Sequence, residues 1–280
     1  MRILIQREIG DETELRQMTV KSLFLDYDGT ISPLHVSRAE SKVPEKTCAV
    51  LMKISRQIPI VIVTTKDPSF VIPRTPFAHA WSTIGGLENK IGYKILETQV
   101  PKHSLQCIST TLEYVKSQVK SVGIDIEEKR NSHGRTLAFS VDWRQAKDAE
   151  MAKHEADRIA AYCETLPLKL IKFEKQPFYD VYPVSVDKGK AVSAILEELK
   201  LKSGVMYLGD SEMDNPAFEV SDISLAVIHD ETPLTVLASD YFVRFGEVPN
   251  LLNALFENHL LFSSNYSMIK TNPWKKSKIE

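Results

Sequence analysis

Two separate stretches of this 280-residue sequence have the pattern of a parallel α/β sheet, and no other feature constrains the fold as strongly. In the first stretch, apolar runs at residues 21–26 and 58–64 flank a helical pattern at residues 44–56. Short apolar runs bounded by polar residues are typical of strands that are buried on both faces. A strand, a helix and a second strand in this order predict parallel strands joined by a right-handed crossover.

The same order of elements returns near the C-terminus. Residues 188–200 have the pattern of an amphipathic helix, and residues 205–209 have that of a buried strand. A short helix, two short strands and a closing helix are then predicted at residues 215–220, 223–227, 241–243 and 249–261. The two stretches together predict the halves of one parallel sheet.

The sequence between these stretches has a different pattern. It predicts four strands, at residues 92–99, 136–143, 169–173 and 179–182, and two amphipathic helices, at residues 100–122 and 146–164. We interpret it as an α+β module with an antiparallel sheet, inserted into a Rossmann-like α/β core. The predicted domains are a discontinuous core at 1–88 and 184–263, an inserted domain at 89–183 and a polar, solvated tail at 264–280.

Composition excludes several classes of protein. The chain has 35 basic and 37 acidic residues, a balance that argues against a nucleic-acid binder that depends on counterion release. No run approaches the roughly 18 apolar residues of a membrane span, and charges interrupt the first 17 residues where a signal peptide would need an apolar run. Cys48, Cys107 and Cys163 are odd in number and widely spaced, which favours idle thiols in a reducing compartment. We expect a cytoplasmic protein with no nucleic-acid or membrane partner, as a monomer or weak dimer.

Asp26 and Asp28 directly follow the first buried strand. Side chains two positions apart in a strand lie on the same side, and the carboxyl ends of strands in an open α/β sheet face the ligand-binding crevice. Two close carboxylates repel each other unless they share a cation or a proton. Gly29 allows a bend after them that Thr30 would stabilise. The pattern indicates a catalytic or metal site, and the alternative is an Asp-rich turn without chemistry.

Asp210 and Asp214 follow the later buried strand in the same way. Carboxylate oxygens are the hard ligands that Mg²⁺ prefers, and Mg²⁺ uses few of them while keeping some waters. Acidic residues at two strand ends of one sheet therefore predict a single Mg²⁺ site formed by Asp26, Asp28, Asp210 and Asp214. A helix-capping role for Asp210 or Asp214 is the alternative.

Two further segments have residues that suit phosphate chemistry. Lys188 begins the helix before the second acidic segment and could neutralise a phosphoryl group or an ionised nucleophile. Taken alone, a lysine at a helix start is more simply a solvated residue. Thr64 and Thr65 end the strand at residues 58–64, where hydroxyl and backbone N–H groups could bind phosphate oxygens.

Taken in their order along the chain, the segments that contain Asp26, Thr64, Lys188 and Asp210 resemble the motifs of the haloacid dehalogenase (HAD) superfamily. The resemblance implies that Asp26 is a nucleophile that forms an aspartyl-phosphate, and that Asp28 is the general acid for the leaving alcohol and then the base for water. It implies that Thr64, or Thr65 if the register differs by one position, holds the phosphoryl oxygens, while Lys188 neutralises charge.

The resemblance also implies a metal site and a subclass. Asp210, and Asp214 directly or through water, would hold Mg²⁺ together with Asp26 and the Asp28 carbonyl. Thirty-six positions separate Asp28 from Thr64, whereas 124 separate Thr64 from Lys188, which is far more than one βα connection needs. The insertion therefore lies between the segment of Thr64 and the helix that begins at Lys188, which is the position of the C2 cap in subclass IIB.

Within that subclass, several segments look closest to trehalose-6-phosphate phosphatases. The run FLDYDGTISP at residues 24–33 is nearly the opening pattern of that family, and the resemblance implies sugar contacts for Lys129, Arg144 and Asp180. Ordinary cap-surface charges are the alternative for these three. The chain departs from the family pattern at Asp142 in place of His, at Asp180 in place of Glu, at residues 64–66 (TTK in place of SGR) and at residues 209–215 (GDSEMDN).

The resulting hypothesis is a Mg²⁺-dependent phosphatase of a phosphorylated sugar, with trehalose 6-phosphate as the first candidate substrate. Alternatives within enzymes are other subclass IIB phosphatases, which act on mannosyl-3-phosphoglycerate, sucrose phosphate or Cof-type substrates, and a phosphomutase. A silent sugar-phosphate sensor is the alternative outside enzymes, and the presence of both Asp26 and Asp28 argues against it.

Overall fold

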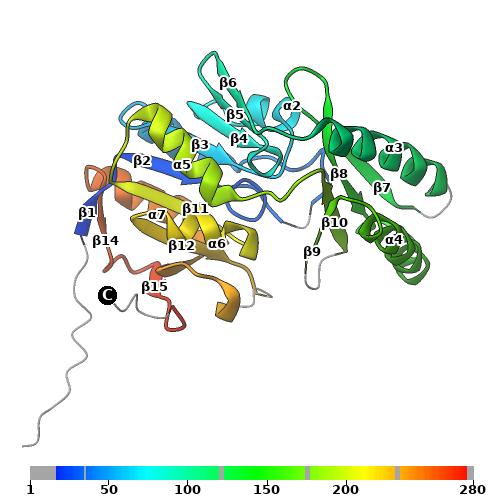
Figure 1. Cartoon of the computed structure of the whole chain (residues 1–280). Coiled ribbons are helices and arrows are strands. Elements are labelled where there is room, and N and C mark those ends of the chain that lie inside the picture. Colours follow the sequence, from blue (N-terminus) through cyan, green and yellow to red (C-terminus); the bar gives the residue numbers. More distant parts are fainter. Residues whose placement is uncertain (1–16, 35, 120–122, 174–176, 231–233, 276–280) are drawn as a thin grey trace, which may run out of the picture.

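A computed structural model describes residues 17–34, 36–119, 123–173, 177–230 and 234–275. Figure 1 shows two domains, a large one built around a twisted sheet and a smaller one whose two long helices lie on the side away from the large domain. The central parallel sheet and the inserted α+β domain confirm the predicted fold class. The predictions for the first 16 residues lie outside the described residues.

The described residues of the large domain form a nine-stranded sheet in the order β15-β13-β12-β11-β2-β3-β4-β5-β6. Its parallel strands are β2 (Ser22–Leu25), β3 (Ile60–Val63), β4 (Ala80–Thr83), β11 (Val205–Gly209), β12 (Ile223–Ile228) and β13 (Tyr241–Arg244). Antiparallel strands extend both edges, namely β5 (Glu88–Ile91), β6 (Lys94–Glu97) and β15 (Ile269–Thr271). The neighbours β2 and β11 join the two sequence stretches at the centre, as predicted.

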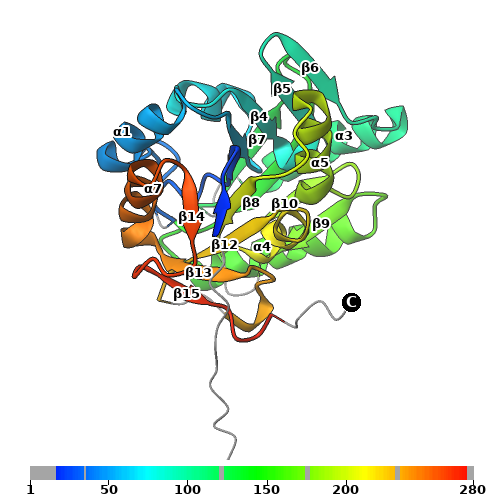
Figure 2. The ribbon, with the colours of Figure 1, turned by 90° about the vertical axis from the view of Figure 1, so that its left-hand side faces the viewer.

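Helices cover both faces of this sheet, which explains why its central strands are continuously apolar. Leu23 and Leu25 pack in one core cluster with α1 (Glu45–Ile54) and α7 (Val248–Glu257), which lie side by side in Figure 2. Phe24 points to the opposite face and packs with α5 (Lys188–Leu199) and α6 (Asn215–Glu219). The shorter elements are α2 (Pro68–Val71) and the pair β1 (Gln17–Thr19) with β14 (Leu261–Ser263).

The small domain, here called the cap, is a four-stranded antiparallel sheet with two helices on one face. Its strand order is β7-β8-β10-β9, with bounds Asp125–Arg130, Thr136–Asp142, Phe178–Tyr182 and Lys169–Lys172. Alternation along β8 sends Phe139 and Val141 into the core beneath α3 (Lys102–Gln118) and α4 (Ala149–Glu164). The intervening Ser140 and Asp142 line a cavity on the other face of the sheet. The strand periodicity thus gives the cap a polar face toward the large domain.

Two predicted segments belong to the large sheet instead. The strand expected at residues 92–99 was assigned to the inserted domain, but β6 pairs with β5 in the nine-stranded sheet, so the core continues past residue 88. Residues 264–280 were expected to be a solvated tail, but β15 pairs with β13. The side chain of Asn272 is buried and donates to the carbonyls of Leu237 and Ser239, both at 2.9 Å.

An apolar joint connects the cap to the large domain. Ile84 and Leu87 of the core pack with Leu137 and Tyr182 of the cap in one buried cluster. Beside this joint, the buried Glu88 carboxylate accepts hydrogen bonds from the backbone N–H and hydroxyl of Ser132, at 2.8 and 2.6 Å. No helix in the described part of the chain has both the length and the apolar character that a bilayer crossing requires.

Candidate active site

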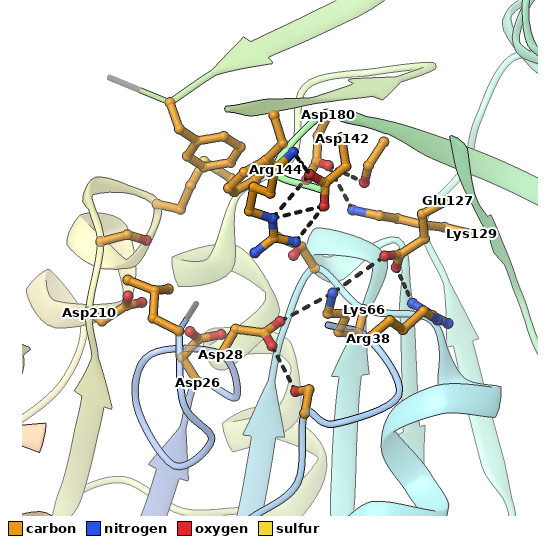
Figure 3. Close-up of a pocket in the computed structure, with 18 of the residues that line it drawn as sticks. Asp26, Asp28, Arg38, Lys66, Glu127, Lys129, Asp142, Arg144, Asp180 and Asp210 are labelled. Atoms are coloured by element: carbon orange, nitrogen blue, oxygen red, sulfur yellow. Dashed lines mark hydrogen bonds and ion pairs between the residues drawn. The ribbon is translucent and has the colours of Figure 1, made fainter. Parts of the chain in front are cut away.

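The carboxyl ends of three neighbouring strands bring the predicted core residues together. Asp26 follows β2, Thr64 follows β3 and Asp210 follows β11, and β2 lies between the other two strands. The Asp26 N–H donates to the Leu208 carbonyl at 2.9 Å, which fixes the end of β2 against β11. In Figure 3, Asp26, Asp28 and Asp210 lie together on the core side of the cavity, facing the charged side chains of the cap.

Three of the four predicted acidic residues form one cluster with the predicted lysine. Asp26, Asp210 and Asp214 each offer a carboxylate oxygen, and these oxygens lie within 4.8 Å of one another. Lys188 Nζ donates to Asp26 Oδ1 at 2.8 Å and to Asp214 Oδ1 at 2.7 Å. Because the Lys188 side chain is only 2% exposed, the alternative of a solvated lysine is wrong.

The charges of this cluster are unbalanced. Burial raises the pKa of Asp26 to about 7, and Asp214 and Asp28 add to the effect of burial while Lys188 opposes it. Burial also raises the pKa of Asp210, as do Asp26 and Asp214. Burial acts to lower the pKa of Lys188, but Asp214 and Asp26 outweigh it, so this pKa is raised. A further cation beside these carboxylates would relieve their repulsion, and their hard oxygen atoms suit Mg²⁺.

Asp214 holds the cluster together and is already saturated with hydrogen bonds. Its Oδ1 accepts from Lys188 and from the Tyr207 hydroxyl, the latter at 2.6 Å. Its Oδ2 accepts from the backbone N–H groups of Asp210 and Ser211 and from the Ser211 hydroxyl, all at 3.1 Å. The contacts with Ser211 form a capping box, so the capping role left open for Asp214 is observed. These donors leave Asp214 better placed to support a metal site through water than to bind the ion directly.

Gly29 allows the first acidic segment to lie directly against Asp210. Its φ is +72°, and a Cβ at this position would lie 2.1 Å from Asp210 Oδ2. On the far side of the turn, His229 Nε2 is 2.7 Å from the Gly29 carbonyl oxygen. The predicted role of Gly29 in a bend therefore includes a second requirement, which is space for the neighbouring carboxylate.

Asp28 points into the cavity and is bound on both sides. Its Oδ1 accepts from the Ser41 hydroxyl at 3.2 Å, and its Oδ2 lies 3.5 Å from Lys66 Nζ. The two threonines after β3 differ in position. Thr64 is buried, and its Oγ1 accepts from the Lys66 N–H at 3.2 Å. Thr65 lines the cavity, whereas Thr64 is not among its described lining residues.

The predicted cap residues reach the same cavity, already paired with carboxylates. Lys129 Nζ lies 2.9 Å from Asp180 Oδ1, and both side chains are 2% exposed. Tyr182 donates to Asp180 Oδ2 at 2.9 Å. The Arg144 guanidinium binds both oxygens of Asp142, with Nε–Oδ2 at 2.9 Å. These residues are therefore not ordinary charges on the outer surface of the cap.

The cavity between the domains encloses about 910 Å³ of space free of protein atoms, its open mouth included. Its lining combines the core acids with cap charges and a few apolar side chains (Figure 3). The lining residues are Asp26, Asp28, Leu34, Val36, Arg38, Ser41, Thr65, Lys66, Glu127, Lys129, Ser140, Asp142, Arg144, Phe173, Phe178, Asp180, Lys188, Asp210, Ser211 and Met213.

Sequence reasoning assigned no role to several of these residues. Lys66 belongs to the segment at residues 64–66 that departs from the family pattern, and Glu127 lies two positions before Lys129, so their position beside the other candidates was a usable signal. Arg38 and Ser41 lie in an irregular loop between β2 and α1, where no periodicity or motif marks them. Arg38 nevertheless bridges Asp67 of the core and Glu127 of the cap.

Residues 24–231 match a family model described as trehalose-phosphatase. The alpha,alpha-trehalose-phosphate synthase (UDP-forming) B of Dictyostelium discoideum is 22% identical over 219 residues, which are 74% of this chain and 26% of that protein. The chain thus spans about a quarter of the length of this curated relative.

Solved structures share the fold at low sequence identity. A trehalose-6-phosphate phosphatase related protein has 19% identity and a TM-score of 0.67, with 85% of this chain and 98% of that chain covered. The C-terminal domain of trehalose-6-phosphate phosphatase from C. albicans has 18% identity and a TM-score of 0.66, with coverages of 85% and 92%. The matched range includes the segments that contain Asp26, Thr64 and Asp210, the helix that begins at Lys188, and the whole cap. This match confirms the predicted resemblance. The chain belongs to the trehalose-phosphatase family.

Proposed function

We propose that this chain is a phosphatase that hydrolyses a phosphorylated sugar through an aspartyl-phosphate, with trehalose 6-phosphate as the first candidate substrate. The observation that carries the proposal is the position of Asp26 and Asp28 at one strand end, beside Lys188 and under a cap with a charged cavity face. Membership of the trehalose-phosphatase family supports the same reaction.

The proposed reaction has two steps that use the same pair of carboxyl groups. In the first, the Asp26 carboxylate attacks phosphorus, the bond from phosphorus to the sugar oxygen breaks, and Asp28 gives its proton to that oxygen. In the second, Asp28 takes a proton from water, the water oxygen attacks phosphorus, and Asp26 is regenerated as phosphate leaves. Lys188 offsets negative charge on Asp26 and on the phosphoryl group, and hydroxyl or N–H groups of Thr64 and Thr65 bind phosphoryl oxygens.

The acidic cluster fits a magnesium ion, because hard oxygen atoms from separate strand ends converge beside Lys188. Asp26, Asp210 and the Asp28 carbonyl would hold the ion, with Asp214 acting through water. When bound, Mg²⁺ supplies positive charge that stabilises the transferring phosphoryl group.

The part of the substrate beyond the phosphate is proposed to be an uncharged polyol. Lys129 is paired with Asp180 and Arg144 with Asp142 within the cap, and Glu127 is paired with Arg38 and Lys66 of the core, so these described charges on the cap side of the cavity are paired. Sugar hydroxyls can donate to the carboxylate and accept from the cation of such a pair, whereas a second anionic group would have to compete with a resident carboxylate. This favours trehalose 6-phosphate over mannosyl-3-phosphoglycerate and over the bisphosphates that a mutase uses.

Phosphate release from a panel of sugar phosphates tests the proposal. We expect the highest kcat/KM with a neutral disaccharide monophosphate, and formation of a phosphorylated isomer instead of free phosphate would identify a mutase. Binding of trehalose 6-phosphate without any turnover would instead identify a sensor. A cytoplasmic location is part of the proposal and is supported by the free thiols of Cys48, Cys107 and Cys163.

A further inference from the structure

Lys66 lies between a carboxylate of the core and a carboxylate of the cap. Its Nζ is 3.5 Å from Asp28 Oδ2 and 3.4 Å from Glu127 Oε2, and its side chain is 12% exposed. Figure 3 shows Lys66 between these two side chains. Asp28 belongs to the segment after β2, whereas Glu127 belongs to β7. One ammonium group therefore contacts both domains at the site of the proposed proton transfer.

The core provides a fixed binding site for Glu127. Arg38 Nη1 binds Glu127 Oε1, while Arg38 Nη2 lies 2.5 Å from Asp67 Oδ2. The Arg38 guanidinium also lies over the Phe70 ring, with Cζ 4.3 Å from the centroid. Asp67 in turn accepts from the Phe70 N–H at 3.0 Å as the N-cap of α2. Arg38 is thus held by core residues, and Glu127 binds it when the cap is docked.

The electrostatics of this site agree with a strong contact between the domains. Burial would raise the pKa of Glu127, but Lys66, Lys129 and Arg38 outweigh it and hold the pKa at about 2. Burial would lower the pKa of Lys66, but Asp28 and Glu127 outweigh it, so this pKa is raised. Glu127 is therefore a carboxylate and Lys66 an ammonium whenever the domains are in contact.

We propose that Lys66 is a positioning residue that makes the orientation of Asp28 depend on docking of the cap, with Glu127 as its partner on the cap. The inference rests on the proposed function. Ser41 binds Asp28 Oδ1 and Lys66 faces Asp28 Oδ2, so together they fix the carboxyl group. Glu127 holds Lys66 between the two carboxylates; without Glu127, the lysine is free to close on Asp28 Oδ2 and occupy the oxygen that must reach the leaving group.

This role differs from that of a residue that only binds sugar. A sugar contact that is equally strong in the ground state and the transition state changes KM and leaves kcat unchanged. A positioning residue acts on the step that needs the proton of Asp28, and its loss lowers kcat. Two residues that act through one chain of contacts also give non-additive effects when both are replaced.

The test compares Glu127→Gln, Lys66→Met and the double variant on trehalose 6-phosphate and on p-nitrophenyl phosphate. General acid catalysis contributes roughly 10²–10⁴-fold, so we expect each single variant to lower kcat for trehalose 6-phosphate about tenfold to a hundredfold. The double variant should lose no more than about threefold beyond Lys66→Met alone. Because nitrophenolate leaves without a proton, kcat/KM for p-nitrophenyl phosphate should stay within about threefold of the wild type.

Glu128→Gln is the matched control, because Glu128 neighbours Glu127 on β7 but pairs within the cap with Lys116 and Arg130. Its kcat should equal that of the wild type. A Glu127→Gln variant with raised KM and unchanged kcat, or strictly multiplicative effects in the double variant, would overturn the inference. A fall of more than about tenfold in kcat/KM for p-nitrophenyl phosphate in Lys66→Met would assign Lys66 to general support of the core and also overturn the inference. A wild-type protein that releases no phosphate from any sugar phosphate would instead contradict the proposed function, and the inference with it.

Discussion

The core side and the cap side of the cavity are organised in different ways. On the core side, strand ends and backbone hydrogen bonds position the backbone of the acidic residues, as the Asp26 N–H to Leu208 carbonyl bond illustrates. On the cap side, the functional side chains are fixed mainly by one another across neighbouring strands. Lys129 on β7, Ser140 on β8 and Asp180 on β10 form one such group.

This difference separates the chemistry from its specificity. A site positioned by backbone geometry tolerates few substitutions, because the backbone does not readjust to bring a different side chain into the same place. A site fixed by pairs of side chains can change when both members of a pair change, as Asp142 with Arg144 suggests at a position where the family pattern has His. We therefore expect core replacements to abolish turnover and cap replacements to change the choice of substrate.

Among the expected effects on the core side, the loss of turnover in Asp26→Asn is the largest. Removal of the proposed nucleophile should lower kcat by at least about a thousandfold, while the amide retains the shape of the side chain and the fold. Phosphate release and circular dichroism measure the two effects. Asp125→Asn, an exposed position at the start of β7, is the control. Turnover above about a tenth of the wild-type rate in Asp26→Asn would exclude Asp26 as the nucleophile.

Removal of metal should have the next largest effect. EDTA should stop phosphate release and added Mg²⁺ should restore it, because Lys188 alone does not balance the carboxylates of the cluster. Independently of activity, saturating Mg²⁺ should raise the thermal midpoint, since a ligand that binds only the folded state stabilises it by about 2.7 kcal/mol at a hundred times its Kd. Asp210→Asn should remove this shift, and a persistent shift would show that the ion binds elsewhere.

Gly29→Ala should damage the core site through backbone strain and through a clash with Asp210. The added Cβ would lie 2.1 Å from Asp210 Oδ2 at a φ of +72°. We expect about 1–3 kcal/mol of lost stability and roughly a hundredfold loss of kcat. Gly92→Ala separates the two causes, because Gly92 has a φ of +57° and no neighbouring atom within 4 Å of its Cβ position. It should lose some stability and keep full activity; equal activity losses in both variants would contradict the clash with Asp210.

The same contrast explains what the sequence could predict. The bounds of β11 agree with prediction to the residue, because a continuous apolar run closed by acids is a local signal. The core residues Asp26, Asp28 and Asp210 were predicted for the same reason, since each follows the end of such a strand. Lys188 begins a helix, where the local pattern alone favours a solvated lysine, and its role came from the family resemblance.

Features that depend on tertiary contacts could not be predicted from the local sequence pattern. The strand β6 was assigned to the wrong sheet, because its half-exposed side chains suit the edge of either one. Arg38 and Ser41 reach the cavity from a loop whose side chains contact Asp67, Glu127 and Asp28, which are distant in the sequence. No local pattern contains that information.

A smaller effect, confined to the cap, should follow from Asp142→Asn. This change frees the Arg144 guanidinium from its carboxylate partner, so the cavity gains an unpaired cation. We expect the ratio of kcat/KM for mannosyl-3-phosphoglycerate to that for trehalose 6-phosphate to rise about tenfold, or about 1.4 kcal/mol. Asp157→Asn breaks an exposed pair with Lys153 on α4 and should leave the ratio unchanged. An unaltered ratio in Asp142→Asn would remove Arg144 from substrate selection.

The last expected effect concerns folding stability and not turnover, and it is the pH dependence of the contact between the domains. The pKa of Glu127 is lowered from 4.5 to about 2, so its ion pairs stabilise the folded state fully above pH 4.5. That contribution is lost as the pH falls through about 2. Glu127→Gln should therefore lower the free energy of unfolding at pH 7 by roughly 1–3 kcal/mol, and its difference from the wild type should shrink as the pH falls below 4.5.

Denaturant unfolding at pH 7, 4.5 and 3 would measure this trend, with Glu113→Gln on the exposed side of α3 as a control of equal charge change. A difference that stays constant over this range would mean that packing, and not the charge on Glu127, holds the cap against the core. In that case the two sides of the cavity would be more alike than their side chains suggest, since the apolar joint around Ile84 and Tyr182 would fix the cap as rigidly as strand ends fix the core.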